Sequence, residues 1–316
     1  MQLPDSFITT IQKAFKEDGE NFLAFLPALV EDASQRWGLT DIRPVPNLSY
    51  NFVAFAKRGT EDVILKIGVP NPELNSEMVA LKLFDGDGAC QLLACDEERG
   101  FLLLERLNPG TVLADIPDDE RTNIAIDVMQ KIWRPLDSGS SLALRVLPAA
   151  EQQAARLQSF IQLSDWFDEL KTVRPKFDGG TGPFPKKIFE RVESVLPELF
   201  ADENVKLIHG DFHHFNILLS ERGWLAIDPK GVIGPAGYEI GPLMINPWGS
   251  LSDGVSFKAQ TKRRMSILSE RLGWERESIL NWAIAHAVLS TWWDTQPDGT
   301  GGEYSLWCAE MFSEIN

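Results

Sequence analysis

The chain has 316 residues, of which 44% are hydrophobic and 24% are charged, and its formal net charge is −16 at pH 7. This length is enough for one large domain or two lobes, and no apolar run approaches the ~18 residues that cross a membrane. The negative charge argues against a nucleic-acid partner, because a protein neutralises phosphates with basic residues. The charge is explained first by solubility, and it is also compatible with a cationic small-molecule substrate.

The start of the chain and its cysteines bear on localisation. The first residues lack the basic-then-apolar layout of a signal peptide. Cys90, Cys95 and Cys308 form neither a disulfide framework nor a tight metal spacing. We therefore expect a cytoplasmic protein with reduced thiols and no membrane partner.

Residues 1–37 are predicted to form an N-terminal helical extension. Phe7, Ile11 and Phe15 recur at four-residue steps, and apolar residues continue at helical spacing after Gly19. Many acidic and few basic residues make a membrane-surface helix a poor alternative. We expect this extension to pack on the lobe that follows.

Residues 38–107 are predicted to form an antiparallel sheet with one helix. Four short apolar runs are typical of strands, and a Gly-containing hairpin turn joins the first two: Phe52–Lys57, Val63–Ile67, Gln91–Cys95 and Phe101–Glu105. Lys66 lies on the second strand, and Glu77 lies at the start of the helix Ser76–Phe84. Taken alone, these two residues read as an outward strand lysine and a solvated first-turn acid.

Residues 108–316 are predicted to be mainly helical. Apolar residues recur at helical spacing in five segments: Ile124–Trp133, Glu151–Lys171, Lys186–Phe200, Phe257–Leu272 and Glu275–Trp293. Arg174–Pro185 is rich in Gly and Pro and is predicted to be a loop.

The most informative stretch is Leu207–Gly231. Asp211 precedes Asn216 by five residues, and a later apolar run ends at Asp228. A polar turn with Gly223 lies between two apolar runs and predicts a β-hairpin, which brings Asn216 and Asp228 close together. Three oxygen-bearing side chains in this arrangement suit phosphoryl transfer, in which one accepts a hydroxyl proton and two hold Mg²⁺ on a nucleotide.

The same stretch resembles a known family. Asp211 with Asn216, and His209 two residues earlier, match the catalytic-loop pattern of kinases. Asp228-Pro-Lys occupies the place of D-F-G. With the doubled His213-His214 and the run that ends at Gly231, the stretch resembles the aminoglycoside phosphotransferases, in particular the streptomycin 6-kinase and hydroxyurea phosphotransferase branch. The resemblance implies an α+β, bilobal, protein-kinase-like fold, with a small antiparallel-sheet N-lobe after the helical extension and a mainly helical C-lobe.

The resemblance also implies roles for individual residues. Asp211 is expected to be the catalytic base, and Asn216 and Asp228 are expected to bind Mg²⁺. Lys66 corresponds to the lysine that holds the α/β-phosphates of ATP, and Glu77 to its carboxylate partner. With the catalytic-loop pattern downstream, we favour these roles over the structural ones.

The segment from Glu105 to Leu107 is predicted to be the hinge that binds the adenine edge. Its backbone would make the contacts, so side-chain identity says little here. Ser49, Tyr50 and Asn51 lie where a kinase has its Gly-rich loop, and no Gly stands there.

Other polar residues have competing interpretations. His209 is expected to be a structural loop histidine and His286 a core histidine. His213-His214 suggest zinc, but adjacent histidines seldom both reach one ion. Lys230 could meet a phosphate or face water. Glu239 is expected to have a structural hydrogen-bonding role.

Substrate selection is expected from the helical lobe near the C-terminus. Aromatic faces beside acids suit an aminated sugar, although core tryptophans next to a solvated loop would give the same pattern: Trp292, Trp293, Asp294, Asp298, Glu303 and Trp307.

We therefore predict a kinase that uses ATP and Mg²⁺ and phosphorylates a hydroxyl of a streptomycin-type or hydroxyurea-like acceptor. Two alternatives remain: a catalytically silent kinase-like nucleotide-binding protein, and a metallophosphoesterase suggested by Gly210-Asp211. The second needs more metal-binding histidines than this chain supplies, since it has four histidines and none before His209. The oligomeric state is left open.

Overall fold

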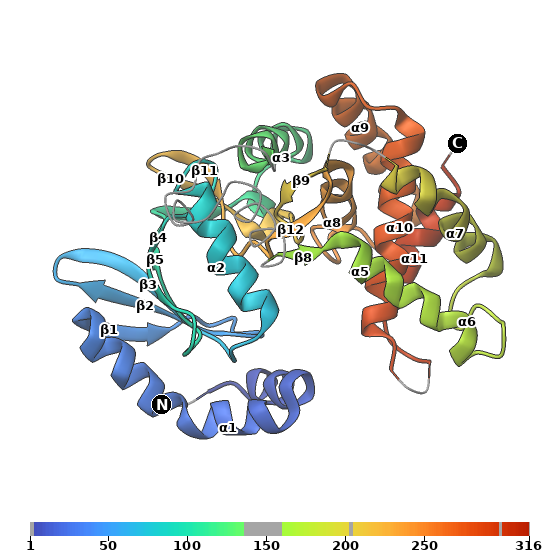
Figure 1. The fold of residues 1–316 in the computed structure, drawn as a ribbon. Helices are drawn as coiled ribbons and strands as arrows, with labels where there is room; N and C mark the ends of the chain where they lie inside the picture. Colours follow the sequence, from blue (N-terminus) through green and yellow to red (C-terminus); the bar gives the residue numbers. More distant parts are fainter. Residues whose placement is uncertain (1–2, 136–159, 202–204, 297–298, 316) are drawn as a thin grey trace, which may run out of the picture.

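The computed structural model describes residues 3–135, 160–201, 205–296 and 299–315. The chain forms two lobes (Figure 1), a sheet with helices at its sides and a mainly helical part. The first lobe contains α1 (Asp5–Trp37), β1 (Leu39–Pro44), β2 (Phe52–Arg58), β3 (Glu61–Ile67), α2 (Pro72–Phe84), β4 (Leu92–Asp96) and β5 (Phe101–Glu105). This arrangement confirms the expected α+β, bilobal architecture.

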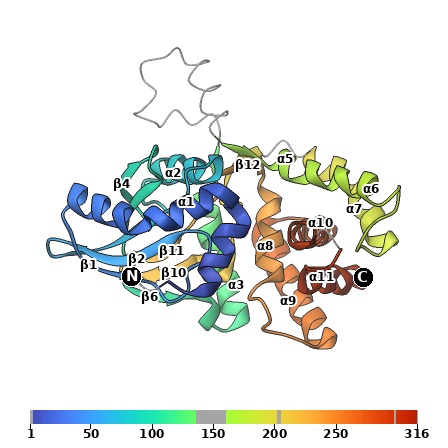
Figure 2. The same ribbon diagram turned by 90° about the horizontal axis from the view of Figure 1, so that it is seen from below.

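The second lobe begins with short strands and continues as helices, which Figure 2 shows beside the first lobe. Its strands are β6 (Pro109–Val112), β7 (Arg134–Pro135), β8 (Ile161–Gln162), β9 (Val205–Ile208), β10 (Ile217–Ser220), β11 (Gly223–Ala226) and β12 (Val232–Pro235). Its α-helices are α3 (Asp118–Ile132), α5 (Leu163–Asp168), α6 (Val173–Lys176), α7 (Lys186–Phe200), α8 (Ile240–Ile245), α9 (Gly254–Leu272), α10 (Arg276–Asp294) and α11 (Glu303–Ser313). Short 3-10 helices complete it: η1 (Leu113–Asp115), η3 (Glu169–Thr172), η4 (His214–Asn216) and η5 (Ala236–Glu239).

The sheet of the first lobe has the order β1-β2-β3-β5-β4, and all of its pairs are antiparallel. Lys66 is therefore on the central strand, opposite Val53 on one side and Leu102 on the other. Helix α2 starts at Asn71, whose side chain accepts hydrogen bonds from the backbone N–H groups of the first turn. This cap fixes the start of the helix that carries Glu77.

Helix α1 confirms the predicted helical extension but contains a break. Lys16 has φ 51° and ψ −123°, so the chain forms one segment from Asp5 to Phe15 and a second that continues to Trp37. A Cβ on Gly19 would lie 2.5 Å from the carbonyl oxygen of Ile11. Glycine therefore allows the two segments to pack closely at this point.

Two small sheets in the second lobe support the Asp211 and Asp228 loops. The predicted hairpin forms between β10 and β11, in register from Ile217↔Ala226 to Ser220↔Gly223, and β6 joins it. Strand β9 pairs with β12 in the other sheet, whose order is β7-β9-β12-β8. The Asp211 loop follows β9, and the Asp228 loop lies between β11 and β12.

Several elements differ from the sequence predictions. Strands β1 and β6 and helix α11 were not predicted. The predicted helix Glu151–Lys171 is confirmed only in part: its described residues contain the helix α5 and part of η3, but also strand β8, and residues 151–159 lie outside the described residues. The predicted loop Arg174–Pro185 begins inside α6. Strands β1 and β6 lie at the edges of their sheets, where tertiary pairing stabilises a strand more than local periodicity does.

The cysteines are free thiols, with Cys90 and Cys308 buried and Cys95 half-buried. Within the described ranges, no helix combines the length and apolar character needed to cross a membrane.

Candidate active site

Lys66, Glu77 and Asp228 form an ion cluster between the two lobes, in which Lys66 and Glu77 are buried and Asp228 is half-buried. The Nζ atom of Lys66 lies 2.7 Å from both Oε1 and Oε2 of Glu77, and it also contacts Oδ1 of Asp228. Lys66 and Glu77 are each only 4% exposed. The three residues come from β3, α2 and the β11–β12 loop, so the cluster joins the lobes at the base of the cleft.

The charges of this cluster are set by burial and by their partners. Burial lowers the pKa of Lys66, but the carboxylates of Asp228 and Glu77 outweigh this effect and raise it. Burial raises the pKa of Glu77 to about 7, although Lys66 opposes the shift. Burial also raises the pKa of Asp228, but Lys66 and Lys230 outweigh it and hold this pKa below its ordinary range. Lys66 therefore stays charged, with Asp228 as its ionised partner.

The backbone of Asp228 has an unusual conformation. Its φ is 58°, in the left-handed region that Asp adopts more readily than most residues. Backbone geometry and the ion pair with Lys66 together orient this carboxylate toward the cleft.

The Asp211 loop is held in place by the side chain of His209, which hydrogen-bonds to the loop backbone and to Ile227 at the end of the hairpin. Nε2 of His209 lies 2.9 Å from the carbonyl oxygen of Ile227, and Nδ1 accepts from the backbone N–H of Asp211 at 3.2 Å. These contacts match a neutral ring that carries its proton on Nε2. Burial lowers the pKa of His209 to about 4, which favours the same neutral form. His209 is thus a structural loop histidine, as expected.

Asn216 ties the end of this loop back to Asp211. Its Nδ2 donates to the carbonyl oxygen of Asp211 at 3.0 Å and lies 3.5 Å from Oδ2 of the same residue. The backbone N–H of Ile227 donates to the carbonyl oxygen of Asn216 at 2.9 Å. Because Nδ2 is engaged with Asp211, Oδ1 is the atom of the Asn216 amide that can meet a cation.

Glu239 supports the loop from below. Its side chain is fully buried, and its Oε1 accepts from the backbone N–H of Gly210 at 2.8 Å. Gly210 has φ 87°, and a Cβ there would lie 2.5 Å from Val232, so the loop requires glycine. Burial raises the pKa of Glu239 to about 8, and the nearby charge of Asp211 acts in the same direction.

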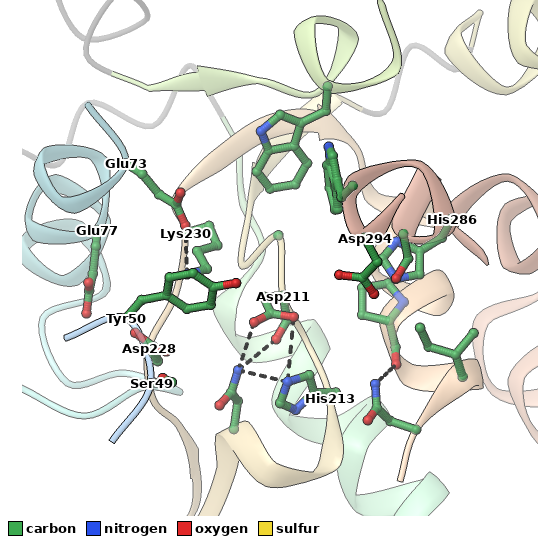
Figure 3. A pocket seen from close by; sticks show the side chains of 18 of the residues that line it. Ser49, Tyr50, Glu73, Glu77, Asp211, His213, Asp228, Lys230, His286 and Asp294 are labelled. Carbon is green, nitrogen blue, oxygen red and sulfur yellow. Dashed lines mark hydrogen bonds and ion pairs between the residues drawn. The ribbon is translucent and has the colours of Figure 1, made fainter. Parts of the chain in front are cut away.

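A cavity of about 790 Å³ opens in front of these groups. Asp211 lies between two sets of labelled side chains (Figure 3), with Glu77, Asp228 and Lys230 on one side and Asp294 on the other. We call the first set, with Lys66, the charged side. The second, which we call the aromatic side, also contains Trp166, Trp248, Glu169 and Trp293. The arrangement gives room for two ligands that meet at Asp211.

The described geometry is that of a two-lobed phosphotransferase cleft, and comparison with known proteins tests this interpretation. A family model described as "Aminoglycoside/hydroxyurea antibiotic resistance kinase" matches residues 36–299. The chain belongs to this family. The predicted resemblance is therefore confirmed, and the protein is a phosphotransferase of the kind that acts on hydroxyl groups.

The relatives of this kinase align with it over most of its length. It is 26% identical to the streptomycin 6-kinase of Streptomyces glaucescens, over 95% of this chain and 92% of the relative. It is 28% identical to the hydroxyurea phosphotransferase of Kitasatospora aureofaciens, over 88% of this chain and 76% of the relative. The choline kinase LicA of Streptococcus pneumoniae has the same fold, with a TM-score of 0.59, 15% identity, and coverage of 92% of this chain and 98% of that one. The protein-kinase-like fold is thus confirmed.

The predicted hinge residues of the kinase lie outside the cavity lining. The carboxylate of Glu105 binds Arg222 at 3.1 and 2.5 Å, and its backbone N–H donates to the carbonyl oxygen of Gln91. Leu107 is buried in an apolar cluster that joins the lobes and contains Leu102, Leu104, Leu225 and, at its edge, Ile64, Leu218 and Ile227. The backbone N–H of Glu105 is therefore engaged in a hydrogen bond within the sheet lobe. The sequence analysis did not predict the apolar cluster around Leu107.

The two adjacent histidines of the kinase are separated by their surroundings. Nε2 of His213 lies 3.6 Å from Oδ1 of Asp211, and His213 lines the cavity. His214 is fully buried, and neither of its ring nitrogens has a hydrogen-bond partner among the described residues. In the part of the chain that is described, no group of three or more His, Cys, Asp or Glu side chains is arranged to hold a metal. His286 is buried with Nδ1 3.0 Å from the hydroxyl of Tyr238, and its ring edge reaches the cavity.

Sequence reasoning also missed an ion pair at the cavity wall. Nζ of Lys230 lies 2.7 Å from Oε1 of Glu73, on the first turn of α2. Burial lowers the pKa of Lys230, but the charges of Asp228 and Glu73 outweigh it and raise this pKa. Lys230 therefore faces the cavity as a charged group, and the pairing of two segments distant in sequence gave no local signal.

Some of the predicted substrate-selecting residues line the cavity, and others pack elsewhere in the helical lobe. Trp293 and Asp294 line the cavity, whereas Trp292 packs against Phe177 and Phe184, and Trp307 packs against Phe257. Glu303 starts α11 and accepts from the backbone N–H of Gly301. Asp298 lies outside the described residues.

Proposed function

We propose that this protein is an ATP-dependent kinase of a streptomycin-type acceptor, with Asp211 as the catalytic base. The observation that carries the proposal is the position of Asp211 between the charged side and the aromatic side of one cavity. In this proposal the hydroxyl oxygen of the acceptor attacks the γ-phosphorus, the bond to the bridging oxygen breaks, and ADP leaves. The hydroxyl proton passes to Asp211.

The charged side is proposed to bind the triphosphate. Lys66 would contact the α/β-phosphates while Glu77 holds its ammonium group in position. Lys230, which faces the same space, would meet phosphate oxygens and exchange Glu73 for them. Both lysines already have carboxylate partners, so the anionic nucleotide would compete with Asp228 and Glu73 for them.

Asn216 and Asp228 are proposed to hold Mg²⁺. A carboxylate and an amide oxygen are hard ligands that this ion prefers, and both residues line the cavity. When bound, Mg²⁺ would neutralise charge on the phosphate oxygens. Pairing with Lys66 keeps Asp228 ionised and therefore ready to bind a cation.

The adenine is proposed to bind near the Glu105–Leu107 segment. The apolar cluster between the lobes would supply its faces, with Ile64 from the sheet and Leu218 and Ile227 from the hairpin. Backbone groups beyond Glu105 would then meet the adenine edge.

The aromatic side supports a cationic acceptor. Trp166 and Trp293 meet edge to face with ring centroids 5.3 Å apart, and the carboxylates of Glu169 and Asp294 line the same space. Aromatic faces beside carboxylates attract guanidinium and ammonium groups. Among the acceptors named for the relatives, this composition favours streptomycin over the uncharged hydroxyurea.

An ATP-consumption assay with streptomycin and hydroxyurea tests the proposal, using Asp211→Ala as the inactive control. We expect phosphorylated streptomycin from the wild type, and at least ~10²-fold slower turnover from the variant with nucleotide binding retained. Unchanged turnover by Asp211→Ala would remove Asp211 from its role. Tight binding of Mg–ATP without any product would instead indicate a silent nucleotide-binding protein.

A further inference from the structure

The first segment of α1 reaches the reaction cavity from a part of the chain that precedes the residues matched by the family model. The family model begins at residue 36, whereas α1 starts at Asp5. Phe15 of α1 nevertheless lines the cavity together with Trp293 and Asp294 of the other lobe. Figure 1 shows α1 below the sheet, with one end reaching toward the helical lobe.

Phe15 is held at the end of a well-anchored helix. Phe7 and Ile11, about two turns and one turn earlier on the same face, are fully buried in the core of the sheet lobe. Phe15 continues this face but is only half-buried, because it packs at the edge of that core and also lines the cavity. The break at Lys16 then turns the chain back, so Phe15 is the last residue of the segment.

Exposed aromatic rings also line this cavity. Tyr50, Trp248 and Trp293 are 54%, 57% and 42% exposed, and all three line it. In Figure 3 Tyr50 lies beside Lys230, with its hydroxyl toward Asp211. Large apolar faces that point into one concave space are covered favourably by a ligand with apolar ring faces.

An electrostatic interaction also links α1 with Asp294 of the other lobe. Burial raises the pKa of Asp294, and the positive charge of Lys13 opposes this shift. Lys13 lies two residues before Phe15, so the segment lies within electrostatic reach of Asp294 across the cavity mouth. The other lobe contributes the carboxylate, and α1 contributes both an apolar ring and a cation.

We propose that the first segment of α1 forms one wall of the acceptor site and that Phe15 is a specificity-determining residue. The ring of Phe15 would pack on the apolar face of the acceptor, while the charged groups of the acceptor meet Asp294. The inference rests on the proposed kinase function and extends it, because it assigns part of acceptor selection to a helix that precedes the residues matched by the family model.

Steady-state kinetics of Phe15→Ala with streptomycin test the inference. We expect the KM for streptomycin to rise about tenfold, since loss of one aromatic contact removes on the order of 1.5 kcal/mol of apolar burial. The KM for ATP should stay within about twofold, because in this proposal Phe15 contacts the acceptor and not the nucleotide. Phe25→Ala is the matched control, since Phe25 is on the same helix, is 63% exposed and does not line the cavity.

Phe15→Leu covers the case in which the alanine variant does not fold. It retains apolar packing but lacks the flat ring face, so we expect a KM for streptomycin raised by about threefold with an unchanged Tm. A KM for streptomycin at the wild-type value in the folded Phe15 variants would overturn the inference and leave the kinase function intact. Failure of the wild type to phosphorylate either streptomycin or hydroxyurea would overturn the kinase function, and the inference with it.

Discussion

The two sides of the cavity differ in how their polar groups are satisfied. On the charged side, Lys66 binds Glu77 and Asp228, and Lys230 binds Glu73. On the aromatic side, Trp293 and Asp294 project into the cavity and remain exposed. The Lys66–Glu77 pair is buried, and a buried ion pair fixes one geometry and is costly to break, whereas exposed rings and carboxylates can change with little effect on folding. We infer that nucleotide binding is the rigid half of the site and acceptor binding is the adaptable half.

The largest effect is expected from removing the charge at Lys66. In Lys66→Met, kcat/KM for ATP should fall by about 10²–10³-fold, because the triphosphate loses a preorganised cation in a buried site. Lys82→Met is the control, since Lys82 lies nearby in sequence but forms an exposed ion pair with Glu97. Steady-state kinetics with a Tm measurement would check both variants. Equal losses in the two would contradict the assignment of Lys66 to the site.

A smaller effect, confined to charged acceptors, is expected on the aromatic side. The double variant Glu169→Gln, Asp294→Asn should raise the KM for streptomycin by about 10- to 100-fold, as expected for the loss of charge-assisted contacts. The KM for ATP should stay near the wild-type value. Hydroxyurea is the matched control, because an uncharged acceptor gains nothing from the carboxylates. An equal rise in the KM for hydroxyurea would show that the double variant changes the shape of the site, and that the lost charge is not the cause.

Glu239, which holds the Asp211 loop through Gly210, gives a pH-dependent prediction. Glu239 has its pKa raised from its ordinary 4.5 to about 8 in the folded protein. Between these values the unfolded chain releases a proton that the folded protein keeps. The contribution of Glu239 to stability is therefore fully present below about pH 4.5 and is lost as pH rises to about 8, by at most ~1.4 kcal/mol per pH unit.

Glu239→Gln separates this effect from other titrations. Glutamine resembles the protonated carboxyl group and can still accept from Gly210, so the variant should match the wild type near pH 4.5. Its Tm should exceed that of the wild type increasingly toward pH 8. A constant Tm difference across this range would show that Glu239 titrates normally.

The smallest effect is expected at the predicted hinge. Arg222→Ala removes the ion pair with Glu105 and the hydrogen bond to the carbonyl oxygen of Gly86. Since the ion pair is partly exposed, we expect a loss of about 1 kcal/mol in stability, measured by denaturant unfolding. The KM for ATP should stay within about twofold. A larger change in that KM would place the Glu105 side chain in nucleotide binding.

Much of the charged side could be predicted from the sequence. Asp211, Asn216 and Asp228 lie within one hairpin-containing stretch, so local spacing was enough to bring them together. Lys66 and Glu77 were also predicted, because a lysine on an apolar strand and an acid on the next helix form a short-range pattern. Glu73 and Lys230 were not paired, since 157 residues separate them and only lobe packing joins them.

The sequence by itself determined the family, the two-lobed architecture and the composition of the catalytic loop, because these depend on periodicity and fixed spacing along the chain. Only the tertiary structure decided which rings face the cavity. Trp292 and Trp293 are adjacent, yet the first packs in the helical lobe and the second lines the cavity. Phe7, Ile11 and Phe15 share one helical face, yet the third lies at the edge of the core and lines the cavity. Periodicity identifies the apolar face of a helix, but the extent of the partner surface determines where burial ends.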